Sequence, residues 1–238
     1  MLLVGALCAG CHMHQSQSRL SAMRPQGKVE IVGAMRNVMR EGQLQGRIRL
    51  DSLENTQNLY GIGPQAYLKG EVLLWDGKGF LATVDGNGMV VKKTLEVNPP
   101  FFVFAAVKEW EEFPLPATWL DLHHLERILD SMTASYPRPF PFRLQGKVSA
   151  AKIHVVNLPE GSVVSSPEEA HRGLLVNYEI QSSQVDVLGF FSKEHQTIFT
   201  HHDSYMHLHL ITRNRKMMGH LDGLKFHGSN MRLSLPKR

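Results

Sequence analysis

Short runs of alternating or continuous apolar residues dominate the chain and predict a mostly β protein. Successive side chains of a strand point to opposite faces, so alternation is typical of a strand with one buried face. The stretch 60–84 predicts two strands joined at Asp76-Gly77, because Asp-Gly between apolar runs is a strong hairpin signal. Further strands are expected at 101–107, 142–148, 151–156, 185–191 and 230–235.

A helical period replaces the alternation in a few places. Apolar residues at helical spacing run from Ile31 to Met39, and Gly42 can end that helix. Thr118 with Asp121 resembles a capping box that opens a second helix. One face of this second helix carries Leu122, Leu125, Ile128, Leu129 and Met132. Ser166-Pro167 resembles a third, short helix start, so the expected fold class is α+β, mostly β.

The stretch 205–221 combines strand alternation with histidines. His207 and His209 are two residues apart, so both imidazoles point to one face, and the intervening apolar residues point to a face that we expect to be buried. A turn about Asn214-Arg215, with the asparagine at positive φ, would pair positions whose numbers sum to 429. His220 then lies opposite His209, with the two Cβ atoms roughly 5 Å apart.

Three imidazoles that converge in this way form the protein half of a catalytic zinc site. The alternative is a chance cluster, since the chain has 13 histidines. Spacing alone leaves both interpretations open.

Length and charge narrow the classes of protein that remain. A chain of 238 residues can form one large domain or two small ones and can bury a real core. With 20% charged and 42% hydrophobic residues it has the composition of a globular protein. The net charge of +4 is spread without a Lys/Arg block, so nucleic-acid binding is not indicated, and no apolar run is long enough to predict a transmembrane helix.

The first 27 residues differ from the rest. Residues 1–11 are apolar and small and resemble the end of a bacterial lipoprotein signal at Cys11, although Cys8 stands where leucine is usual and no basic residue precedes the run. Residues 12–27 are polar and predict a flexible tether. We expect an exported protein with a lipid anchor at Cys11, and the alternative is a cytoplasmic protein with an apolar N-terminal segment. Both cysteines lie in this segment, so no disulfide is expected in the body of the chain.

Two charged residues interrupt predicted strands. Glu71 precedes an apolar run, and a buried carboxylate there would have a raised pKa suited to proton transfer. Arg143 stands between Phe142 and Leu144, and an arginine can hold a carboxylate through two hydrogen bonds. The pattern alone favours a solvent-facing position for both.

Four segments resemble bacterial α-acetolactate decarboxylase, over about residues 33–235. GIGPQAYLKGEVLLWDGKGF resembles the family block with Gly-x-Gly-Thr, Leu-Asp-Gly-Glu and a Leu-Asp-Gly turn, and FPFRLQGKV resembles its Ala-Ile-Arg-Ile-x-Gly-x-Phe strand. VDVLGFFSKEH resembles Val-Gly-Phe-Trp-Ser-Pro, and YMHLHLITRNRKMMGHLD resembles Tyr-His-Leu-His-Phe-Ile followed by Gly-Gly-His-Val-Leu-Asp. Each block is degenerate alone, but four in the same order are specific.

This resemblance implies a fold, a site and a reaction. The fold would be two similar mixed β-sheet halves curled toward partial barrels, with the metal between them. Zn²⁺ would be held by His207, His209 and His220, while Glu71 and Arg143 would be catalytic. The reaction would be decarboxylation of 2-acetolactate to acetoin, in which Glu71 moves a proton and Arg143 holds or positions the substrate.

The sequence also departs from the family pattern. Pro64, Met206 and Met218 replace a threonine, a histidine and a glycine, and no acidic residue follows the final Leu-Pro. An alternative is therefore an exported, non-catalytic relative that binds a small hydroxy or keto acid at a metal, and a homodimer is a further open expectation. We expect the leader and tether at 1–27, an N-terminal β-rich half at 28–118, and a C-terminal β-rich half with the histidine hairpin at 119–238.

Overall fold

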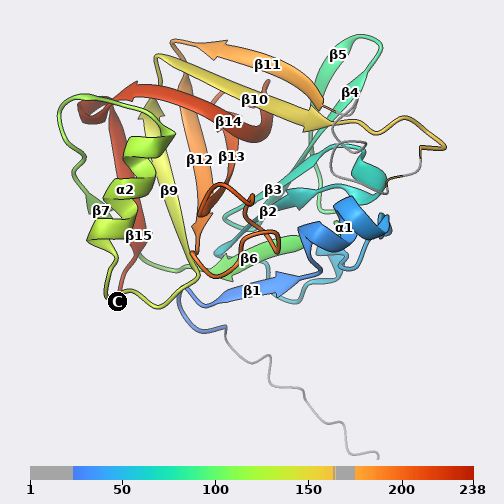
Figure 1. The fold of residues 1–238 in the computed structure, drawn as a ribbon, viewed down its shortest axis with the longest axis horizontal. Helices are drawn as coiled ribbons and strands as arrows, with labels where there is room; N and C mark the ends of the chain where they lie inside the picture. Colours follow the sequence, from blue (N-terminus) through green and yellow to red (C-terminus); the bar gives the residue numbers. More distant parts are fainter. Residues whose placement is uncertain (1–23, 163, 165–174) are drawn as a thin grey trace, which may run out of the picture.

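The computed structural model describes residues 24–162, 164 and 175–238 (Figure 1). The expected leader with Cys11 and the helix start at Ser166 lie outside the described residues. The described part of the chain forms two β-sheets and two α-helices.

The first sheet has six strands in the order β1-β6-β2-β3-β4-β5. Its strands are β1 (Val29–Val32), β2 (Leu59–Pro64), β3 (Glu71–Trp75), β4 (Lys78–Asp85), β5 (Gly88–Lys93) and β6 (Phe102–Ala106). The expected hairpin at 60–84 is in fact three strands, because a 3₁₀ turn at Ala66–Leu68 separates β2 from β3. Asp76 and Gly77 join β3 to β4 with φ of 50° and 73°, as a tight hairpin turn requires.

The second sheet has nine strands, with the main path β11-β10-β14-β13-β12-β9-β15-β7 and β8 paired to β14. These are β7 (Trp110–Phe113), β8 (Trp119–Leu120), β9 (Phe140–Lys147), β10 (Ala150–Val156), β11 (Leu175–Gln181), β12 (Gln184–Phe191), β13 (Met206–Thr212), β14 (Met218–His227) and β15 (Met231–Pro236). The chain changes sheets between β6 and β7, and the division into two halves at 118/119 stays a prediction.

Both helices form where apolar periodicity indicated them, with different starts. Ile31 belongs to β1, so helix α1 covers only Met35–Glu41 and ends at Gly42, whose φ is 63°. Helix α2 (Leu122–Met132) is capped by Asp121, whose carboxylate accepts a hydrogen bond from the His124 amide at 2.9 Å. The expected capping box at Thr118 was wrong, because Asp121 is the N-cap. Within the described residues, neither helix is long and apolar enough to cross a membrane.

Two central strands of the nine-stranded sheet, β12 and β13, are buried on both faces. One face packs under α2 and contributes Phe142, Leu208 and Leu210 to that core (Figure 1). The other face packs against the six-stranded sheet, where Leu188 and Ile211 meet side chains such as Leu73. The apolar face expected for β13 is therefore confirmed, and its histidine face is buried too.

A mostly β fold is confirmed, and two details of the expected architecture are wrong. Neither sheet closes into a barrel, and all pairings between named strands are antiparallel, so the sheets are not mixed. Short turns link many successive strands, and such turns can join only antiparallel neighbours.

Candidate metal centre

The histidine hairpin has the register that spacing predicted. His209 pairs with His220, Leu210 with Gly219 and Ile211 with Met218. The turn differs in one detail, because Arg215 and not Asn214 takes the positive φ, at 59°. Asn214 instead accepts hydrogen bonds through its side chain, from the Thr212 hydroxyl at 2.8 Å and from the amide at position 216.

The three imidazoles converge on one point. Ring centroids lie 5.1 Å apart for His207–His209, 5.1 Å for His207–His220 and 5.7 Å for His209–His220. One nitrogen from each ring lies within 4.8 Å of the others, and all three side chains are buried. Such a group could hold a metal ion.

The protonation state of these three imidazole rings is compatible with metal binding. Burial lowers the pKa of the His209 imidazole from 6.5 to about 3, and it holds the pKa values of His207 and His220 well below their ordinary range. The rings are therefore neutral near pH 7, which is the form that donates a nitrogen lone pair to a metal. The Nδ1 atom of His207 and both ring nitrogens of His209 are buried without a hydrogen-bond partner among the described residues. A metal would give such nitrogens the partner that burial denies them.

Glu71 approaches the histidines from the other sheet. It begins β3, and its Oε2 lies 3.4 Å from Nε2 of His209. Its Oε1 accepts a hydrogen bond from the Val156 amide at 3.4 Å. Burial raises the pKa of the Glu71 carboxyl well above its ordinary value, and the nearby Asp222 charge adds to the effect. The solvent-facing position favoured by the strand pattern was wrong.

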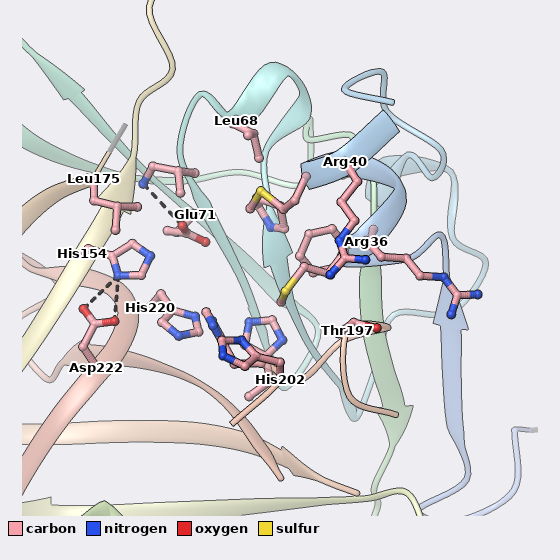
Figure 2. Close-up of a pocket in the computed structure, with 17 residues that line it drawn as sticks. Arg36, Arg40, Leu68, Glu71, His154, Leu175, Thr197, His202, His220 and Asp222 are labelled. Carbon is pink, nitrogen blue, oxygen red and sulfur yellow. Dashed lines mark hydrogen bonds and ion pairs between the residues drawn. The ribbon is translucent and has the colours of Figure 1, made fainter. Parts of the chain in front are cut away.

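His154 and Asp222 form a pair beside the cluster that sequence reasoning missed. Nδ1 of His154 lies 2.8 Å from the nearer Asp222 oxygen, and the His154 ring stacks on His220 with centroids 4.7 Å apart (Figure 2). The stack arises because β10 pairs with β14, which sets His154 directly opposite His220. The His-x-Asp spacing in β14 was a signal for Asp222, but nothing local pointed to His154.

Arg143 shares a face with the histidines without reaching them. Arg143 pairs with Leu188, and Leu188 pairs with His209, so one leucine side chain separates them along the row. The guanidinium carbon lies 4.6 Å from the centre of the Trp110 ring. Arg143 is half-buried, burial lowers its pKa, and it is absent from the cavity wall described next. Its catalytic role stays a prediction.

A cavity of about 370 Å³ opens at the cluster (Figure 2). Glu71, His207 and His220 form part of its wall, together with the His154–Asp222 pair. Helix α1 forms another part, and apolar side chains such as Leu68, Phe101 and Val156 lie between them. The volume suits a small organic molecule that contacts His207, His220 and Glu71 at once.

Fold and site together define a class: two-sheet antiparallel β proteins with a buried three-histidine cluster at a cavity. The family model described as alpha-acetolactate decarboxylase matches residues 32–237. The chain therefore belongs to the alpha-acetolactate decarboxylase family.

Solved structures support the fold. The chain is similar to alpha-acetolactate decarboxylase from Bacillus subtilis strain 168, with a TM-score of 0.73 and 19% identity over 88% of this chain and 85% of that one. It is also similar to a Staphylococcus aureus protein of unknown function described as similar to alpha-acetolactate decarboxylase, with a TM-score of 0.71 and 18% identity over 87% and 84%. Among curated proteins no match is found.

Proposed function

We propose that this protein is a zinc-dependent decarboxylase that converts 2-acetolactate to acetoin and CO₂. The observation that carries the proposal is the buried cluster of His207, His209 and His220 in a member of this family, with His207, His220 and the neighbouring Glu71 on the wall of a small cavity.

His207, His209 and His220 would hold the zinc through three neutral imidazoles, the ligand set that suits a catalytic zinc with an open position. When bound there, zinc supplies a Lewis acid that polarises substrate oxygens and favours the charge that develops on them. Neighbouring rings pack against two of the ligands: His154 stacks on His220, and the ring centroid of Phe101 lies 6.2 Å from that of His207.

Glu71 would supply the proton that completes the reaction. Breaking the bond to the carboxyl group releases CO₂ and leaves an electron pair on the adjacent carbon, which must take up a proton to give acetoin. The Glu71 carboxyl is buried, and burial raises its pKa well above the ordinary value, which favours the protonated form that can act as an acid. Among the described residues it is the only carboxyl group close to a ligand histidine, with Oε2 3.4 Å from Nε2 of His209.

The apolar part of the wall would exclude water from the reacting carbon. Leu68, Phe101 and Val156 are buried and line the cavity near Glu71. With water excluded, the interactions of charged groups in the cavity are stronger. Glu71, and not a water molecule, then supplies the proton.

The test is acetoin release from racemic 2-acetolactate by purified protein, before and after metal removal by a chelator. The proposal expects acetoin from the zinc-loaded protein, loss on chelation and recovery on adding zinc. His207→Ala should lose both zinc and acetoin release while keeping its circular dichroism spectrum. Fully zinc-loaded, folded protein that releases no acetoin would overturn the proposal in favour of a non-catalytic binding protein.

A further inference from the structure

Two arginines of helix α1 bring fixed positive charge to the cavity wall. Arg36 and Arg40 are one helical turn apart, both are exposed, and both line the cavity. No other lysine or arginine belongs to the described wall. Among the described side chains of the wall, α1 therefore supplies the permanent positive charge, in addition to that of the proposed zinc.

The two side chains take different directions. Arg40 runs toward the cavity interior, whereas Arg36 extends away from the histidines (Figure 2). Within residues 24–162 and 175–238, neither forms an ion pair or a side-chain hydrogen bond. A guanidinium that faces a cavity without a partner is free to bind an anion with two parallel hydrogen bonds.

The acidic groups of the described wall have partners other than these arginines. Asp222 is paired with His154 at 2.8 Å, and Oε2 of Glu71 lies 3.4 Å from Nε2 of His209. The remaining titratable groups of the wall are His201, His202, His207 and His220. An anionic ligand would therefore meet two arginines that form no ion pair with the acidic groups of the described wall.

Arg143, the other arginine expected to hold a carboxylate, is poorly placed to do so. Leu188 separates it from His209 within the sheet, and its guanidinium packs on Trp110. Arg40 lies on the cavity wall, whereas Arg143 does not.

We propose that Arg40 binds the carboxylate of the substrate and makes the cavity selective for small 2-hydroxy or 2-oxo acids over their neutral counterparts. This inference rests on the proposed function for the choice of substrate, but its test uses binding and not turnover. Arg36, with the same charge one turn away, is the matched control.

The test is isothermal titration calorimetry of zinc-loaded protein with 2-hydroxy-2-methylbutanoate and with its neutral amide, 2-hydroxy-2-methylbutanamide. Neither has the keto group that the reaction needs, so both report binding alone. Wild-type protein should bind the acid about 10-fold or more tightly than the amide, the size expected for hydrogen bonds to a charged group. Arg40→Gln should remove most of that preference, Arg40→Lys should restore only part of it, and Arg36→Gln should keep it.

The inference is overturned if the wild type shows no preference for the acid, if Arg40→Gln keeps the preference, or if Arg36→Gln loses as much. Zinc content and circular dichroism would be measured for each variant as a control that the fold and the metal site are intact. Both should be unchanged, because the Arg36 and Arg40 side chains are exposed. Wild-type protein that makes no acetoin but shows an Arg40-dependent preference would overturn the decarboxylase and support Arg40. Wild-type protein that makes acetoin, together with an Arg40→Gln variant that keeps the preference for the acid, would support the decarboxylase and overturn the role of Arg40.

Discussion

The metal-free protein should lose stability in mild acid because its site histidines are buried in the neutral form. Burial lowers the pKa of His209 from 6.5 to about 3 in the folded state. A group with a depressed folded pKa binds a proton more readily in the unfolded chain. Its contribution to stability is therefore complete above pH 6.5 and is lost as the pH falls toward 3.

The size of the effect follows from the shift. Each pKa unit corresponds to about 1.4 kcal/mol, so His209 alone removes about 2 kcal/mol of unfolding free energy at pH 5 and about 3 kcal/mol at pH 4. Glu71 acts in the opposite direction, since a raised folded pKa adds stability as the pH falls through it toward the ordinary carboxyl range.

A matched pair of variants separates these two groups. Glu71→Gln and Glu71→Gln/His209→Leu both lack the opposing carboxyl, and they differ only in the imidazole. We would measure guanidinium unfolding of both, free of metal, from pH 7.5 to pH 4. Between these limits the variant with His209 should lose about 3 kcal/mol more than the variant with leucine.

Parallel stability profiles for the two variants, within about 1 kcal/mol over the whole range, would refute the claim that His209 is buried and neutral. If the leucine variant fails to fold, His209→Asn serves in its place because asparagine does not titrate. Zinc-loaded wild type is the positive control, since a bound metal should resist protonation of its ligands to lower pH.

Four further outcomes follow from the structure and sequence. Glu71→Gln should leave binding of 2-hydroxy-2-methylbutanoate nearly intact and lower acetoin turnover about 10²–10⁴-fold; unchanged turnover would remove it from the reaction. Arg143→Lys should leave kcat and KM nearly unchanged because Arg143 lies outside the described cavity wall, and a fall in both turnover and substrate binding would restore the role expected from the sequence. Gly189→Ala should destabilise the fold by about 1–3 kcal/mol, because the new Cβ meets the Phe142 ring at 2.3–2.8 Å, and adding Phe142→Leu should recover much of the loss in thermal unfolding. If Cys11 is lipidated, the protein in its host should fractionate with membranes and Cys11→Ser should release it, whereas an unprocessed protein in the soluble fraction would contradict the leader.

Sequence reasoning succeeded where the determining contacts are local. His209 and His220 lie in one hairpin, so their register follows from the turn and needs no knowledge of the rest of the fold. The C-terminal end of α1 was predicted at Gly42 for the same reason, because a residue with φ of 63° ends a helix locally. Such features depend on a few neighbouring residues.

Features that depend on packing between distant strands could not be predicted from the sequence pattern. The burial of Glu71 depends on the nine-stranded sheet packing over β3, which no pattern within β3 reveals. His154 meets His220 only because β10 pairs with β14 with a register shift between Lys152 and Ile153. The leucine between Arg143 and His209 likewise depends on strand order.

The difference between local and distant residues has a consequence for the order in which the site assembles. The three histidines lie within 14 residues of one another, and short loops close at little entropic cost. Glu71 reaches them across 138 residues of chain, and Arg40 lies further still, so both wait for the two sheets to dock. On the proposed function, a folding chain would therefore bring its metal ligands together before it brings Glu71 and Arg40 to them. Metal uptake and catalytic activity would then be separable, and a variant with weakened contact between its sheets should bind metal without releasing acetoin.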